Sequence, residues 1–108
     1  MAIYQIIEHD ADKFSLIFSE FDQSEAIFNE YDLEGGGYSW HAVLDALIRL
    51  HAPELIDTID FDPEGSMFAA VSRSQKALEQ LGSLLEHALE DEDFLREGIE
   101  NADLELLD

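Results

Sequence analysis

Two segments near the start of the chain have a two-residue alternation that would place successive side chains on opposite faces of a strand. Residues 2–8 alternate, and residues 13–19 do so more cleanly, with Phe14, Leu16 and Phe18 on one face. The Asp-Ala-Asp stretch between the two segments has a composition typical of turns. Alternation with a period of two residues on both sides of a turn predicts a β-hairpin.

The spacing of apolar residues then changes to that of helices. Ser24 is expected to cap a short helix, with acidic residues in its first turn as the helix dipole favours. The three glycines at 35–37 end this helix. A second helix is predicted from near Ser39 to His51, where apolar residues recur every three or four positions.

A turn that begins at Pro53 leads to a second pair of alternating segments, residues 58–62 and 67–71. The acidic, glycine-containing turn between them predicts another hairpin. Ser74 is expected to cap the clearest helix of the chain, in which leucines and alanines form one apolar stripe. Residues 91–108 are expected to form an acidic helix or tail that docks by its apolar edge.

The order of these elements is hairpin, helices, hairpin and long helix, and it predicts an α+β fold. We expect a two-layer sandwich in which an antiparallel sheet of about four strands, from two hairpins, carries the helices on one face. The length of 108 residues suits one domain, so residues 1–108 are expected to form a single domain.

Charge is the outlying property of the sequence. It has 26 Asp and Glu against 5 Lys and Arg, which gives a formal net charge of −21. Such a charge attracts cationic partners and repels nucleic acid and anionic membranes. We therefore expect a basic protein as the partner, with no nucleic acid and no membrane. A general role of the charge in solubility, or in a salt-rich habitat, is the alternative.

The cellular compartment follows from what the sequence lacks. Without cysteine the chain forms no disulfide and no thiolate metal site, a pattern that suits a reducing cytoplasm. Its first residues lack the basic and apolar regions of a signal peptide. Its uncharged stretches fall far short of the roughly 20 residues that span a bilayer. A cytoplasmic location is expected.

Two segments partly match ligand-binding loops. Residues 60–65 copy the opening of an EF-hand loop, but Val71 stands where the closing bidentate glutamate belongs, so a hairpin turn is the better interpretation. The glycines at 35–37 lack the lysine and the preceding strand of a phosphate-binding loop. Their expected role is backbone freedom where two helices meet. No metal and no cofactor are expected.

No catalytic signature is found either. His41 and Asp45 are the only histidine–carboxylate pair that we expect at helical i,i+4 spacing, and a surface contact is a better explanation than half of a zinc site. The serines lie at helix caps and strand ends, without the sequence context of an activated nucleophile. We therefore expect that the protein is not an enzyme, and a small acidic enzyme is the weakest hypothesis.

One aromatic residue lies outside the helical packing pattern. Trp40 begins the apolar stripe of its helix and is expected in the core, whereas Tyr38 lies off that stripe among acids. An amphipathic aromatic beside carboxylates is typical of an interface anchor. The sequence therefore predicts a partner-binding surface at Asp32, Glu34 and Tyr38. A second candidate patch comprises the acids of the later hairpin, Asp60, Asp62 and Glu64.

Three motifs together resemble the immunity protein 51 family of bacterial polymorphic toxin systems. They are EYDLEGGGYSW at 30–40, APEL at 52–55 and FDPEGSMF at 61–68. Gly36 and the Ala69-Ala70 pair depart from the usual pattern, at positions that concern packing more than function. The resemblance implies that the protein neutralises a cognate toxin by direct binding.

Two binding hypotheses follow. The first is an immunity protein that blocks a cationic toxin, such as a nuclease with a basic substrate groove, by placing carboxylates where phosphates would bind. The second is an acidic nucleic-acid mimic that inhibits a DNA- or RNA-binding protein without a dedicated toxin. A toxin gene beside the gene for this protein would favour the first.

Overall fold

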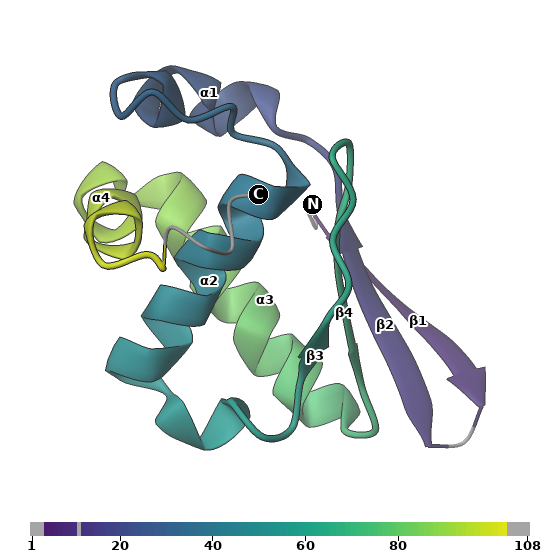
Figure 1. Ribbon diagram of the computed structural model, residues 1–108. Coiled ribbons are helices and arrows are strands. Elements are labelled where there is room, and N and C mark those ends of the chain that lie inside the picture. Colours follow the sequence, from purple (N-terminus) through teal and green to yellow (C-terminus); the bar gives the residue numbers. More distant parts are fainter. Residues whose placement is uncertain (1–3, 11, 104–108) are drawn as a thin grey trace.

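The computed structural model describes residues 4–10 and 12–103. Figure 1 shows the elements that these residues form. They are β1 (Gln5–Asp10), β2 (Lys13–Phe18), α1 (Asp22–Asn29), α2 (Gly37–His51), the 3-10 helix η1 (Pro53–Leu55), β3 (Asp60–Phe61), β4 (Phe68–Ser72), α3 (Gln75–Glu90) and α4 (Glu92–Glu100). The start of the first expected strand and the end of the expected acidic tail, residues 1–3 and 104–108, lie outside the described residues.

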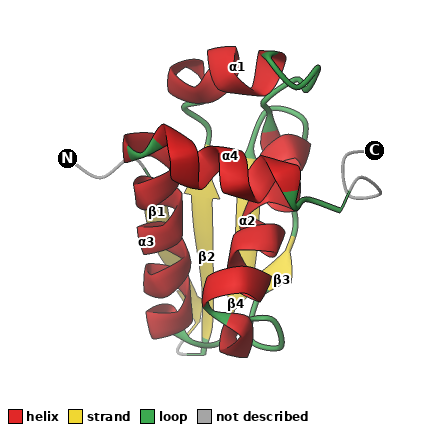
Figure 2. Cartoon of the chain, turned by 90° about the vertical axis from the view of Figure 1, so that its left-hand side faces the viewer, coloured by secondary structure: helices red, strands yellow, loops and turns green. Residues whose placement is uncertain are grey.

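The strands form one antiparallel sheet in the order β1-β2-β4-β3. The two predicted hairpins, β1–β2 and β3–β4, are both present, and β2 joins them by pairing with β4 from Phe14↔Ser72 to Phe18↔Phe68. Figures 1 and 2 show the helices gathered on one side of this sheet. The prediction of an α+β fold with a four-stranded antiparallel sheet is confirmed.

The core lies between the sheet and the helix layer. Alternation along β2 directs Phe14, Leu16 and Phe18 toward the helices, where all three are buried. Trp40 of α2 is 0% exposed and meets the rings of Phe18 and Phe28 edge-on, with centroid distances of 5.5 and 5.4 Å. Edge-on aromatic pairs contribute about 0.5–1.5 kcal/mol each beyond area burial. The prediction that Trp40 belongs to the core is confirmed.

Helix α4 crosses α2 and α3 on the side of the helix layer away from the sheet, as Figure 2 shows. Gly98 marks the closest approach. A Cβ atom added to Gly98 would lie 2.8 Å from Cγ1 of Val43 and 3.1 Å from Cγ of Leu47, both on α2. The absence of a side chain at Gly98 therefore allows α4 to seat closely on α2.

The helix starts agree only in part with the sequence-based expectations. Ser74 caps α3 as predicted, because its hydroxyl oxygen accepts a hydrogen bond of 3.1 Å from the backbone N–H of Ala77. The predicted cap at Ser24 was wrong. Helix α1 begins at Asp22, and the Ser24 hydroxyl, buried within the first turn, donates to the carbonyl of Phe21 at 3.2 Å.

The second and third glycines of the triplet allow two backbones to touch. The N–H of Gly37 donates to the carbonyl of Gly65 at 3.2 Å. A Cβ atom on Gly36 would lie 2.5 Å from that carbonyl oxygen, and one on Gly37 would collide with the carbonyl oxygens of Glu64 and Met67. Helix α2 can therefore start, at Gly37, directly against the turn that joins β3 to β4.

The substitution Gly37→Ala tests this contact. We expect it to lower the free energy of unfolding by about 1–3 kcal/mol, because the new methyl group must displace backbone atoms rather than a flexible side chain. Urea denaturation measures the change. Gly65→Ala is the control, since its methyl group would find Cε2 of Tyr38 at an ordinary 3.9 Å, and we expect a change within about 0.5 kcal/mol. Equal losses in the two variants would contradict the prediction.

Candidate protein-binding surface

The loop after α1 presents its acids outward and one leucine inward. The backbone turns back on α1, with the N–H groups of Tyr31 and Leu33 both donating to the carbonyl of Phe28 at 3.0 Å. Asp32 has a φ of 61°, a left-handed conformation that aspartate tolerates better than most residues. Leu33 packs against the core, while Asp32 and Glu34 are exposed. The alternation of the loop thus fixes which side chains face solvent.

Tyr38 stands at the first turn of α2, beside that loop. Its side chain is 41% exposed, in contrast to the fully buried Trp40 two residues later. Tyr38 lines a small hollow of about 230 Å³ together with Asp32, Glu34 and Gly65. The structure therefore brings the three residues of the first predicted patch together around one depression.

The second predicted patch is divided by the structure. Glu64 lies in the β3–β4 turn, next to Gly65 and hence beside the hollow. Its backbone forms an isolated antiparallel β-bridge with Met67. Asp62 follows β3, and its N–H donates to the carbonyl of Ala69 at 2.8 Å. Asp60 begins β3 and lines a separate cleft of about 650 Å³. We name Asp32, Glu34, Tyr38, Glu64 and Gly65 the acidic loop surface.

The separate cleft has a mixed charge and lies at the other end of the sheet. Its ionisable lining residues are Asp10, Asp12, Lys13, Asp57, Asp60 and Arg73. Because two cations stand among these acids, the cleft is less strongly negative than the acidic loop surface. Asp60 therefore belongs to a different electrostatic environment from Asp32 and Glu34.

The acids of the loop surface are unneutralised. Within residues 4–10 and 12–103, Arg49 forms an ion pair with Asp45 at 3.0 Å and Arg96 with Glu30 at 3.1 Å, whereas neither Asp32 nor Glu34 has a cation within ion-pair distance. Unpaired carboxylates around a partly exposed aromatic ring give a surface that attracts a cationic group and offers it apolar contact area.

The family comparison covers this surface and nearly all of the chain. A family model described as immunity protein 51 matches residues 4–104. This chain belongs to the immunity protein 51 family. Membership gives it an immunity function in general terms, with a cognate toxin protein as the partner, and such families are generally non-enzymatic. No curated protein and no solved structure showed a significant match.

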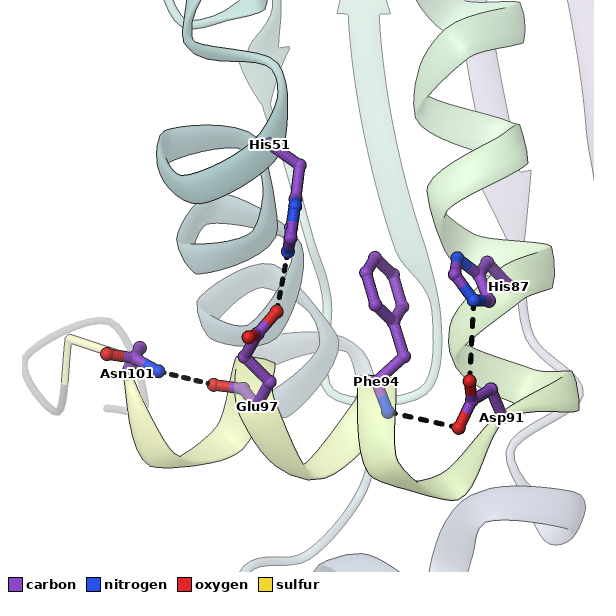
Figure 3. A network of polar contacts seen from close by, with 6 residues as sticks. All are labelled: His51, His87, Asp91, Phe94, Glu97 and Asn101. Atoms are coloured by element: carbon purple, nitrogen blue, oxygen red, sulfur yellow. Dashed lines mark hydrogen bonds and ion pairs between the residues drawn. The ribbon is translucent and has the colours of Figure 1, made fainter.

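The immunity protein also has a histidine–aromatic cluster that the sequence analysis missed. Figure 3 shows His51 of α2 and His87 of α3 on the two sides of Phe94 of α4. The rings of His87 and Phe94 are stacked at 3.9 Å, and those of His51 and Phe94 lie 5.1 Å apart. This cluster fastens the first half of α4 to the two helices beneath it.

The expectation that His41 and Asp45 form the only histidine–carboxylate pair at helical spacing was wrong. His87 Nε2 lies 3.5 Å from a carboxylate oxygen of Asp91, four residues later. A further histidine–carboxylate pair joins two helices, because His51 Nε2 lies 2.5 Å from Oε1 of Glu97. The first pair spans the junction of α3 and α4, where the sequence pattern predicts that the long helix gives way to the tail. In the part of the chain that the structure describes, no three His, Asp or Glu side chains form a group that could hold a metal ion, and no helix is long and apolar enough to cross a membrane.

His41 is the most buried of the described histidines. Its ring lies 4.5 Å from that of Phe61, and burial lowers its pKa below 6.5, an effect that the charge of Asp45 partly offsets. A histidine that resists protonation in the folded state contributes stability above the unfolded pKa, and that stability is lost as the pH falls below it.

The pH dependence of unfolding tests this environment. We expect the stability advantage of the wild type over His41→Gln to shrink as the pH falls from about 7.5 to about 5.5, because only the wild-type unfolded state takes up the extra proton. Urea denaturation of both proteins across this range isolates the difference from the titration of the many carboxylates, which the two share. An advantage that is constant or grows would contradict the prediction.

Proposed function

We propose that this protein neutralises its cognate toxin by covering a basic surface of the toxin with the acidic loop surface. The observation that carries the proposal is the grouping of Asp32 and Glu34, both unpaired, around the exposed ring of Tyr38. Membership of an immunity protein family supports a protein partner. In this proposal residues 1–108 act as one immunity-type domain in the cytoplasm of the toxin-producing cell.

The charge and the aromatic ring affect different rates in such an interface. A net charge of −21 steers a cationic partner and raises the rate of association. A tyrosine that becomes buried on binding supplies contact area and slows dissociation. The exposed Asp62 extends the negative surface from the β3–β4 turn, whereas Asp60 lines the separate cleft. A toxin with a basic groove, such as a nuclease, fits this arrangement.

The proposal is tested first with the product of a toxin gene adjacent to the gene for this protein. We expect the two purified proteins to form a complex and the activity of the toxin to fall with stoichiometric addition. A toxin that is inhibited without any detectable complex would contradict direct binding.

The double charge reversal Asp32→Lys with Glu34→Lys tests steering. We expect association with the toxin to slow by about tenfold or more at low salt and by less at high salt, where charges are screened beyond about 10 Å at 0.1 M. Stopped-flow kinetics at several salt concentrations measure this. Glu54→Lys with Asp57→Lys is the control, because it makes the same change of net charge at exposed acids of the η1 connection. Equal slowing by both pairs would contradict a local role of the loop.

The substitution Tyr38→Ala tests the anchor. We expect dissociation to accelerate and the complex to weaken by about 2 kcal/mol, while the free energy of unfolding changes by no more than about 0.5 kcal/mol because the ring is largely outside the core. Surface plasmon resonance and urea denaturation on the same variant measure the two quantities. A lower melting temperature with unchanged affinity of the folded protein would show that Tyr38 only packs on its own domain.

A further inference from the structure

Two long-range contacts tie the start of the acidic loop to α4. The guanidinium group of Arg96 donates to both carboxylate oxygens of Glu30, each at 3.1 Å, across 66 residues of sequence. The hydroxyl of Tyr31 donates to Oε2 of Glu100 at 2.8 Å, across 69 residues. Glu30 and Tyr31 directly precede Asp32, so both contacts act on the backbone that presents the acidic loop surface.

Helix α4 is itself firmly seated, which makes it a suitable support. Its first N–H groups are capped by Asp91, whose carboxylate accepts from Asp93 and Phe94 at 3.0 and 3.3 Å. Phe94 is held between two histidine rings, as Figure 3 shows. One turn later Gly98 lies directly against α2. The seat of α4 on α2 and α3 is therefore independent of its contacts with the loop.

The loop gains from such support, because the helix that precedes it is short and its acids lie close together. Helix α1 has only eight residues and no side-chain cap, and isolated helices of that length are marginal in water. The loop contains two left-handed residues, Asp32 and Gly35. The acids at 30, 32 and 34 also repel one another, and Arg96 is the described cation that pairs with one of them.

We propose that α4 is a brace for the acidic loop surface, and that Arg96 and Glu100 are positioning residues for binding of the toxin. This inference rests on the proposed function of that surface. Arg96 holds Glu30 by a bidentate contact and offsets local repulsion, while Glu100 fixes the ring of Tyr31. The guanidinium of Arg96 is charged at every working pH, and the hydrogen bonds that it donates to Glu30 raise its pKa further. A loop ordered in advance does not lose that freedom when the toxin binds.

The free protein tests the brace without any toxin. We expect amide hydrogen exchange of residues 31–38 to be at least about fivefold faster in Arg96→Gln and in Tyr31→Phe, with exchange in α3 and the sheet unchanged. The overall stability should change little, because Arg96 and Glu30 are partly exposed, at 31% and 55%. Arg73→Gln is the control, since it removes the same charge from an exposed residue that has no ion pair among the described residues.

A charge swap separates positioning from general destabilisation. Glu30→Arg alone and Arg96→Glu alone each place like charges together and should speed exchange in the loop. The double variant restores opposite charges with the net charge of the wild type, and we expect it to recover most of the protection. Unchanged exchange in the single variants, or no recovery in the double variant, would overturn the brace.

Binding to the toxin completes the test. We expect Arg96→Gln to weaken the complex by about tenfold, with Arg73→Gln close to the wild type. If Asp32→Lys and Tyr38→Ala weaken binding but Arg96→Gln does not, the positioning role is wrong and the proposed surface stands. If none of these variants affects binding while loop exchange responds to Arg96→Gln, the proposed surface is wrong, and the positioning role falls with it.

Discussion

The arrangement of this protein depends on one backbone contact, between the glycines at 36–37 and the turn at residues 64–67. These segments lie about thirty positions apart in the sequence and belong to different layers of the sandwich. Because no side chain separates them, α2 begins against the sheet hairpin, and its first residues receive a fixed orientation. Trp40 then enters the core and Tyr38 faces outward, so one constraint sets both the main packing residue and the proposed anchor.

The second constraint is charge. A formal net charge of −21 opposes compaction, and among the described residues no ionisable side chain is buried. Among the described residues the buried polar side chains are the serines Ser24, Ser39 and Ser72, each of which takes part in a hydrogen bond, and the indole Nε1 of the buried Trp40 has no partner. Stability therefore comes from an apolar core, and the acids remain on the surface, where a partner can reach them.

Much of the fold could be predicted from local patterns. Alternation predicted both hairpins, and helical spacing together with the Ser74 cap predicted α3, because these signals arise within a few neighbouring residues. The Ser24 cap failed because a serine hydroxyl can equally bond a carbonyl inside the first helical turn. The pairing of β2 with β4 follows from packing of the whole chain, which local patterns do not contain.

The candidate site, too, could be predicted from the sequence only in part. Its residue types could be predicted, since exposed acids beside an aromatic stand out in the sequence. The contact that places Tyr38 beside Gly65 could not, because it is made by backbone atoms from distant segments. The ion pair between Arg96 and Glu30 could not be predicted either, because nothing in the sequence around either residue indicates a partner 66 residues away.

The short strand β3 has a consequence for behaviour at high concentration. It is an outer strand of the sheet, it pairs over only two residues, and acids stand at its ends, with Pro63 shortly after. Outer strands can recruit strands from other molecules, and brevity, charge and proline each oppose this. At high concentration this side of the sheet therefore resists strand pairing between copies of the chain, which would otherwise lead to aggregation.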